Sequence, residues 1–62
     1  MVRVNLSGLD VQGVHFHAAV TDAVGHVVRK TKEEPPMFLV KLLFSFKGVT
    51  EVDVPADRIR AA

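Results

Sequence analysis

The sequence predicts an all-β domain: a five-stranded antiparallel small barrel with a single 3₁₀ turn near the C-terminus. Short segments in which apolar and polar residues alternate recur along the chain, and glycine or proline interrupts them. Valine and phenylalanine, which favour sheets, fill most of the apolar positions. An antiparallel sheet of this size closes readily, because closure removes the unpaired edges.

The segment at residues 37–46 is the strand against which the rest of the chain is expected to pack. One of its faces is wholly apolar and is predicted to be buried; it carries Phe38, Val40, Leu42, Phe44 and Phe46. The opposite face carries Met37, Leu39 and Leu43 around Lys41. A strand with two apolar faces is usually central or part of a subunit contact. We expect Met37, Leu39 and Leu43 to form an interface, unless the strand bends and turns part of this face inward.

The remaining strands are expected at residues 2–6, 14–20, 24–31 and 49–54. A helix over residues 14–28 is the competing interpretation, since alanines favour a helix, but the valines and glycines there favour a sheet. Gly25 is expected to mark a bulge or a close backbone crossing. In the last strand, Val52 and Val54 are expected to face the core together with Thr50.

Glycine and proline predict the connections between these strands. Gln12–Gly13 and Lys47–Gly48 are expected to form turns, the second of them joining two antiparallel strands. Residues 32–36 are polar and end in two prolines, so we expect a charged loop there, with pairing restarting at Met37. Pro55–Ile59 is expected to stop the last strand and form the 3₁₀ turn, and residues 60–62 are expected to fray.

The length of 62 residues is enough for one domain, residues 1–62. A domain this short buries only about 60% of its unfolded surface, and disulfides, metals or oligomerisation usually support it. The chain has no cysteine but is 48% apolar, which favours oligomerisation. Its net charge of +1 is low for a dedicated nucleic-acid binder. Arg3 is not followed by the apolar segment that a signal peptide has, and no run of apolar residues is long enough to span a membrane. We therefore expect a cytoplasmic protein.

The second half of the chain resembles the SH3-like small barrels. The resemblance covers roughly residues 23 to 60 and rests on Gly25–Arg29, Phe38–Leu42, the glycine turn and Val52–Ile59. This half of the chain is similar to KOW-type domains of translation factors, to a photosystem I accessory subunit and to the barrel of the nitrile hydratase β-subunit. In that class a V-x-V-P-x-x-x-[IL] ending leads through a short 3₁₀ turn to the last barrel strand. The resemblance implies this fold but no catalytic residue, and the chain lacks the Tyr and Trp that line SH3 peptide grooves.

His15, His17 and His26 are the only side chains that suggest a metal site. Two histidines one residue apart on a strand share a face, and a third from a neighbouring strand could complete a zinc site. We nevertheless expect them to be surface or interface residues, with no metal and no cofactor. If they lie in a subunit contact, their protonation would weaken it.

A set of basic residues suggests nucleic-acid binding as an alternative; it consists of Arg3, Arg29, Lys30, Lys32 and Lys41. Two glutamates follow this set in the predicted loop and partly neutralise it. All aromatic residues are phenylalanines, and most of them are expected in the core, so stacking partners for bases are lacking.

The sequence therefore favours a small non-enzymatic interaction or assembly module, which self-associates or docks on a larger complex through the outer face of residues 37–45. The expected partner is a second copy or another protein, not a membrane. The alternative is a small nucleic-acid-binding barrel. A third hypothesis is an enzyme whose site forms at an oligomer axis, as in one SH3-like reductase family.

Overall fold

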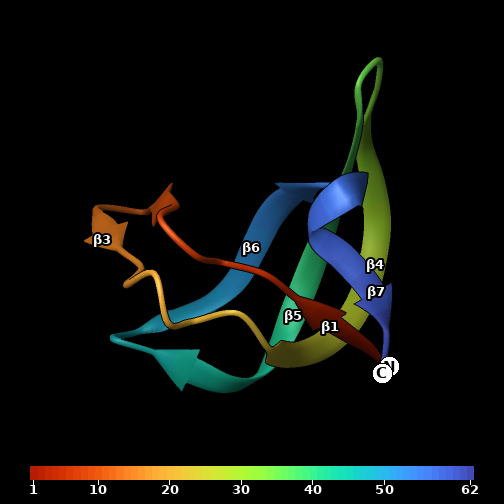
Figure 1. Cartoon of the computed structure of the whole chain (residues 1–62). Coiled ribbons are helices and arrows are strands. Elements are labelled where there is room, and N and C mark those ends of the chain that lie inside the picture. The colour runs from red at the N-terminus through yellow and green to blue at the C-terminus, as the bar shows by residue number, and fades with distance from the viewer.

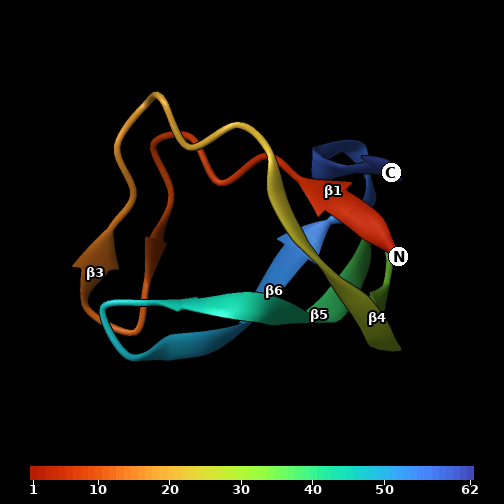
Figure 2. The same ribbon diagram turned by 90° about the horizontal axis from the view of Figure 1, so that it is seen from below.

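A computed structural model describes residues 1–62 and consists mainly of antiparallel strands (Figures 1 and 2). The elements are β1 (Val2–Val4), β2 (Asp10–Val11), β3 (Val14–His15), β4 (Ala23–Glu33), β5 (Pro36–Phe46), β6 (Val49–Pro55), a 3₁₀ turn η1 (Ala56–Arg58) and β7 (Ile59–Ala61). Five strands form one sheet in the order β6-β5-β4-β1-β7, and β2 and β3 form a separate hairpin. These features confirm the all-β, antiparallel class and the single 3₁₀ turn. The outer strands β6 and β7 are not paired with each other, so the sheet is open.

The expected strand at residues 14–20 is wrong, and the fifth strand of the sheet lies at the C-terminus instead. Gln12 and Gly13 both have positive φ and fold β3 back onto β2. Only β3 is a strand in that region, because the chain turns after it: the backbone N–H of Val20 donates to the carbonyl oxygen of His17, and that of Thr21 to the carbonyl oxygen of Ala19. The segment expected to fray forms β7, which pairs with β1 and places the chain termini side by side (Figures 1 and 2). The pairing sets Ile59 beside the buried Val4, and this contact holds the C-terminal strand.

The hairpin of β5 and β6 has two registers. Its turn is Lys47–Gly48, both with positive φ, as predicted, and it pairs Phe46 with Val49. Further along, Lys41 pairs with Glu51. Four residues of β5 lie between these two pairs, against one residue of β6, so β5 contains a bulge.

The side chains of β6 explain this shift of register. Without it, Asp53 would lie opposite Leu42 on the buried face, and burying an unpaired carboxylate costs several kcal/mol. The shift brings Val52 opposite Val40, and both are buried. Residues 43–45 absorb the excess length, and they have no register partner on either neighbouring strand.

The bulge overturns part of the predicted buried face. Val40 and Leu42 are buried as expected, and Phe38 is half-buried. Phe44, however, is 79% exposed and Phe46 is 39% exposed. The prediction that these two side chains are buried is wrong, because strict alternation along β5 ends where the bulge begins.

The hairpin of β4 and β5 is longer than expected. The predicted loop at residues 32–36 is wrong, because Lys32 pairs with Met37 and Glu33 pairs with Pro36, which leaves only Glu34–Pro35 at the tip. These pairs extend the hairpin beyond the rest of the sheet (Figure 1).

Gly25 lies where β4 passes between two neighbours, with Val2 of β1 on one side and Leu42 of β5 on the other. A Cβ atom at this position would lie 2.4 Å from the carbonyl oxygen of Lys41. The close backbone crossing predicted at Gly25 is therefore confirmed.

The core is small and draws on β1, β5, β6 and the segments beside β2 and β3. Its fully buried apolar members are Val4, Leu6, Phe16, Val40, Leu42, Val49, Val52 and Val54. Val52 and Val54 face inward as predicted, whereas Thr50 is exposed and Val49 is buried in its place. None of the helical structure, which is limited to η1, is long and apolar enough to cross a membrane.

Candidate functional site: the Phe46 patch

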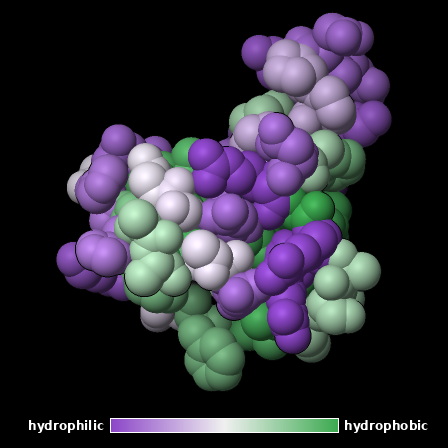
Figure 3. Space-filling model, viewed as in Figure 1, coloured by the Kyte–Doolittle hydropathy of each residue, from purple (hydrophilic) through white to green (hydrophobic).

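Phe46, the last residue of β5, lies at the centre of an apolar surface. Its ring packs edge-to-face on the buried ring of Phe16, with centroids 5.5 Å apart. Three hollows of about 100, 270 and 290 Å³ adjoin Phe46. We call the accessible apolar residues that line them the Phe46 patch: Val14, Val20, Ala23, Val24, Phe44 and Phe46, with Ala19 at the margin. The face seen in Figure 3 mixes hydrophilic and hydrophobic residues, and hydrophobic residues protrude at its lower edge.

Phe44 projects from this patch. It stands on the bulge of β5 and lines the 270 Å³ hollow together with Val24, Ala23 and Phe46. It is the most exposed large apolar side chain of the chain. Monomeric soluble proteins seldom expose contiguous apolar patches without a function, so the Phe46 patch is the candidate docking surface.

The interface predicted from the sequence lies elsewhere on β5. Met37 and Leu39 are half-buried, and Leu43 is 46% exposed. Met37 lies in register between Lys32 and Pro55, so a charged side chain borders the apolar surface on one side at this end. None of the three predicted residues lines a hollow beside Phe46.

The alternation of residues 37–46 predicts Phe44 and Phe46 in the core, whereas the structure exposes both side chains. A signal was present in the sequence of the hairpin. Strict pairing from the Lys47–Gly48 turn sets Asp53 opposite Leu42, which is incompatible with a buried face. A bulge before Phe46 was therefore predictable from the two strands together.

The three histidines do not converge. His15 lies 2.8 Å from a carboxylate oxygen of Asp10 through its Nδ1 atom. The Nδ1 atom of His17 accepts a hydrogen bond from the backbone of Ala19, and His26 lies in β4 opposite Lys41. No three His, Cys, Asp or Glu side chains are grouped so that they could hold a metal ion.

The basic residues of the alternative function fall into two groups. Arg3 lies in β1 beside Arg60, whereas the other four lie on the hairpin of β4 and β5. Carboxylates accompany the second group, since Lys41 pairs in register with Glu51 and Lys30 lies 3.5 Å from Glu33. The structure therefore does not gather the predicted basic residues into one patch.

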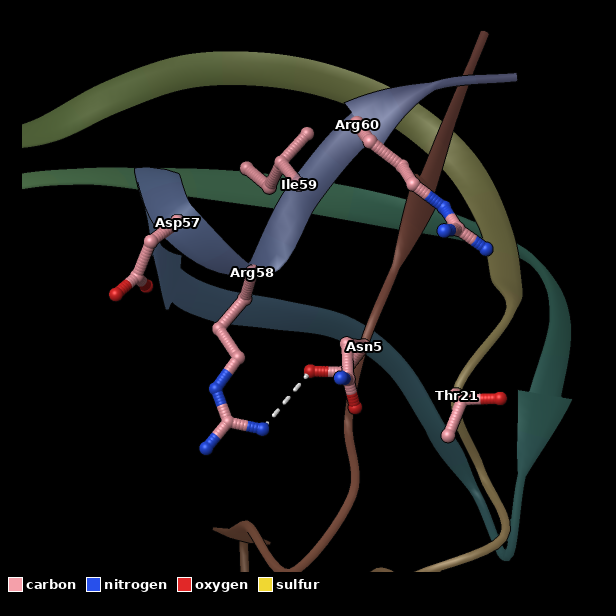
Figure 4. A pocket seen from close by; sticks show the side chains of 6 residues that line it. All are labelled: Asn5, Thr21, Asp57, Arg58, Ile59 and Arg60. Atoms are coloured by element: carbon pink, nitrogen blue, oxygen red, sulfur yellow. Dashed lines mark hydrogen bonds between the residues drawn. The ribbon is translucent and has the colours of Figure 1, made fainter.

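A polar hollow of about 330 Å³ lies between β1 and the C-terminal segment (Figure 4). Its arginines already bind parts of the chain: Arg58 donates to the carbonyl oxygens of Ser7, at 3.0 Å, and Asn5, at 3.4 Å. In Figure 4, Arg60 extends away from Arg58; it donates to the carboxylate of Asp22. This hydrogen bond lowers the pKa of Asp22 below its usual value. Both arginines therefore join segments that are distant in the sequence.

Comparisons of the chain with protein-family models, with curated proteins and with solved structures give no match.

Proposed function

We propose that the chain is a small non-enzymatic interaction module that docks on a protein surface through the Phe46 patch. The observation that carries the proposal is the position of Phe44, which is 79% exposed beside apolar hollows. Burying one phenylalanine side chain contributes about 1.5–3 kcal/mol. In the isolated domain the Phe44 side chain stays in contact with water. Its burial by a partner surface would stabilise the complex by this amount.

The proposal includes an SH3-like barrel as the fold. Its support is the 3₁₀ turn η1, which leads from β6 to the short last strand β7, as the V-x-V-P ending of that class implies. The open sheet is the respect in which the chain departs from a closed barrel. Fold alone assigns no function, so the docking role rests on the patch.

The face that carries Met37, Leu39 and Leu43 stays a prediction. It offers less accessible apolar area than the Phe46 patch, because only Leu43 is exposed there. The proposed docking role therefore uses the Phe46 patch and does not require the face of Met37, Leu39 and Leu43.

Site-specific photo-crosslinking in the cell of origin tests the docking role. A photoreactive phenylalanine analogue at position 44 is expected to give discrete protein adducts. The matched control places the analogue at Val28, which is 50% exposed on β4 and lines none of the hollows. Discrete adducts from position 44 alone support the proposal, and no adduct from position 44 contradicts it.

Nucleic-acid binding through Arg3, Arg29, Lys30, Lys32 and Lys41 remains the alternative. The separation of Arg3 from the hairpin and the adjoining carboxylates make it the weaker proposal. It requires an affinity for DNA or RNA that falls steeply as salt rises. An affinity for nucleic acid that is undetectable at low salt excludes it.

A further inference from the structure

We infer that the partner of the Phe46 patch is a second copy of this chain, arranged by two-fold symmetry so that Phe44 of each copy enters a hollow beside Phe46 of the other. This inference rests on the proposed function and deepens it. In a two-fold contact the same surface faces itself, so it must carry both a projection and a recess that fits it.

The patch carries both parts. Phe44 is the projection, since it stands on a bulge and is 79% exposed. The recesses are the hollows of about 270 and 290 Å³, which share Ala23 and Phe46. An apolar cavity of about 150 Å³ holds a benzene molecule, so either hollow is large enough for a phenyl ring.

The charges that line the two larger hollows permit contact with an identical surface. Two-fold symmetry repeats every charge, and like charges that face each other destabilise an interface. The one carboxylate that lines the larger hollows, Asp22, already accepts a hydrogen bond from Arg60. Its charge is therefore compensated within each copy.

The exposed area of the patch is of the order of the lower limit for a dimer interface. Specific interfaces bury at least about 1,000 Å² in total, or about 500 Å² per copy, which is roughly one eighth of the 4047 Å² surface of this chain. A phenylalanine side chain offers roughly 200 Å² when fully exposed, and Phe44 keeps 79% of its surface exposed whereas Phe46 keeps 39%. Phe44 and Phe46, with the valines and alanines around them, supply an area of this order.

The chain lacks the disulfides and metal sites that usually stabilise small domains. It has no cysteine for a disulfide and no cluster of side chains that could hold a metal ion. Only eight apolar residues are fully buried. Association of two copies would add the burial that one copy lacks.

Sedimentation equilibrium of the purified full chain, from about 1 to about 200 µM, tests this inference. The wild-type chain is expected to pass from one to two chain masses with a dissociation constant of the order of micromolar. Phe44→Ser and Phe44→Lys are expected to stay monomeric over the whole range while their circular dichroism spectra remain those of the folded chain. The matched control, Leu43→Ser, removes a neighbouring exposed apolar side chain outside the hollows and is expected to dimerise as the wild type does.

The outcomes separate this inference from the proposed function. A wild-type chain that is monomeric at about 200 µM overturns the second copy as partner. So does a dimer that Leu43→Ser weakens as much as Phe44→Ser does. If cross-links from position 44 then reach other proteins, the docking role survives and only the identity of the partner is wrong.

Discussion

The ring of Phe46 lies edge-on to the ring of Phe16, with centroids 5.5 Å apart and ring planes at 62°. Phe16 is 1% exposed and belongs to the core, whereas Phe46 is 39% exposed and forms the centre of the proposed docking surface. The contact ties the segment after β3 to the end of β5. The stability of the domain and the shape of its proposed interface therefore depend on the same pair.

Truncating these two rings is expected to have unequal effects on stability. Phe16→Ala removes a fully buried ring and costs about 3–5 kcal/mol, which is most of the stability of so small a domain. Phe46→Ala costs about 1–2 kcal/mol, because its ring is partly solvated. Urea unfolding followed by circular dichroism measures both changes. Equal losses for the two variants would show that Phe46 is buried.

The bulge in β5 predicts opposite outcomes at two nearby positions. Leu42→Ser leaves a cavity and a hydroxyl in the core and is expected to cost about 2–4 kcal/mol. Phe44→Ser changes an exposed side chain and is expected to stay within about 0.5 kcal/mol of the wild type. Both are measured by urea unfolding at a concentration at which the chain is monomeric. A large loss of stability in the Phe44→Ser variant would show that this ring is buried, and it would contradict the bulge in β5.

Gly25→Ala is expected to destabilise the sheet by about 1–3 kcal/mol. The added methyl group would lie 2.4 Å from the carbonyl oxygen of Lys41 and 2.9 Å from Cγ1 of Val40, so the strands must separate. The control is Gly48→Asn, where nothing lies within 4 Å and where asparagine adopts the positive φ more readily than most residues, so a smaller loss is expected. Thermal unfolding of both variants checks the prediction, and an unchanged midpoint for Gly25→Ala would contradict the close crossing.

The ion pair of Asp22 and Arg60 predicts a dependence of stability on pH. The hydrogen bond from Arg60 lowers the pKa of Asp22 in the folded chain below the reference value of 3.8, and the Thr21 hydroxyl adds a smaller effect in the same direction. The stabilisation is therefore present above the unfolded-state pKa and is lost as the pH falls through the folded-state pKa.

Unfolding free energies of the wild type and Asp22→Asn, measured at intervals from about pH 6 to about pH 2, test this dependence. The advantage of the wild type over Asp22→Asn is expected to shrink as the medium becomes acidic. The control Asp57→Asn makes the same change at a carboxylate that forms no ion pair, and it is expected to leave the contribution of the Asp22–Arg60 pair in place. Parallel curves for the wild type and Asp22→Asn would exclude a contribution from this ion pair.

Local signals in the sequence predict the hairpin strands well. The alternation in β4, β5 and β6 and the Lys47–Gly48 turn identify these elements within a few residues of their observed bounds. Gly25 is correctly predicted as a close crossing, because only the absence of a side chain permits the approach of Lys41. Each of these features depends on residues that are near one another in the sequence.

Features that depend on distant residues escape this reasoning. The short strand β7 forms because β1 offers it an edge and Val4 packs beside Ile59, and its own three residues carry no clear alternation. The exposure of Phe44 depends on the register between β5 and β6, which is set by the need to keep Asp53 out of the core. The exposed position of Phe44, on which the proposed docking surface rests, is predictable only by comparing both strands of that hairpin.

Fluorine NMR tests the central claim, that a second copy of the chain covers Phe44. The chain has four phenylalanines, so labelling with 4-fluorophenylalanine gives four signals, and Phe44→Ser identifies the one from position 44. A soluble paramagnetic agent is expected to broaden the Phe44 signal in dilute solution but not at a concentration at which the dimer prevails. The signal of the buried Phe16 is expected to stay sharp throughout. A Phe44 signal that is broadened equally at every concentration would contradict the claim.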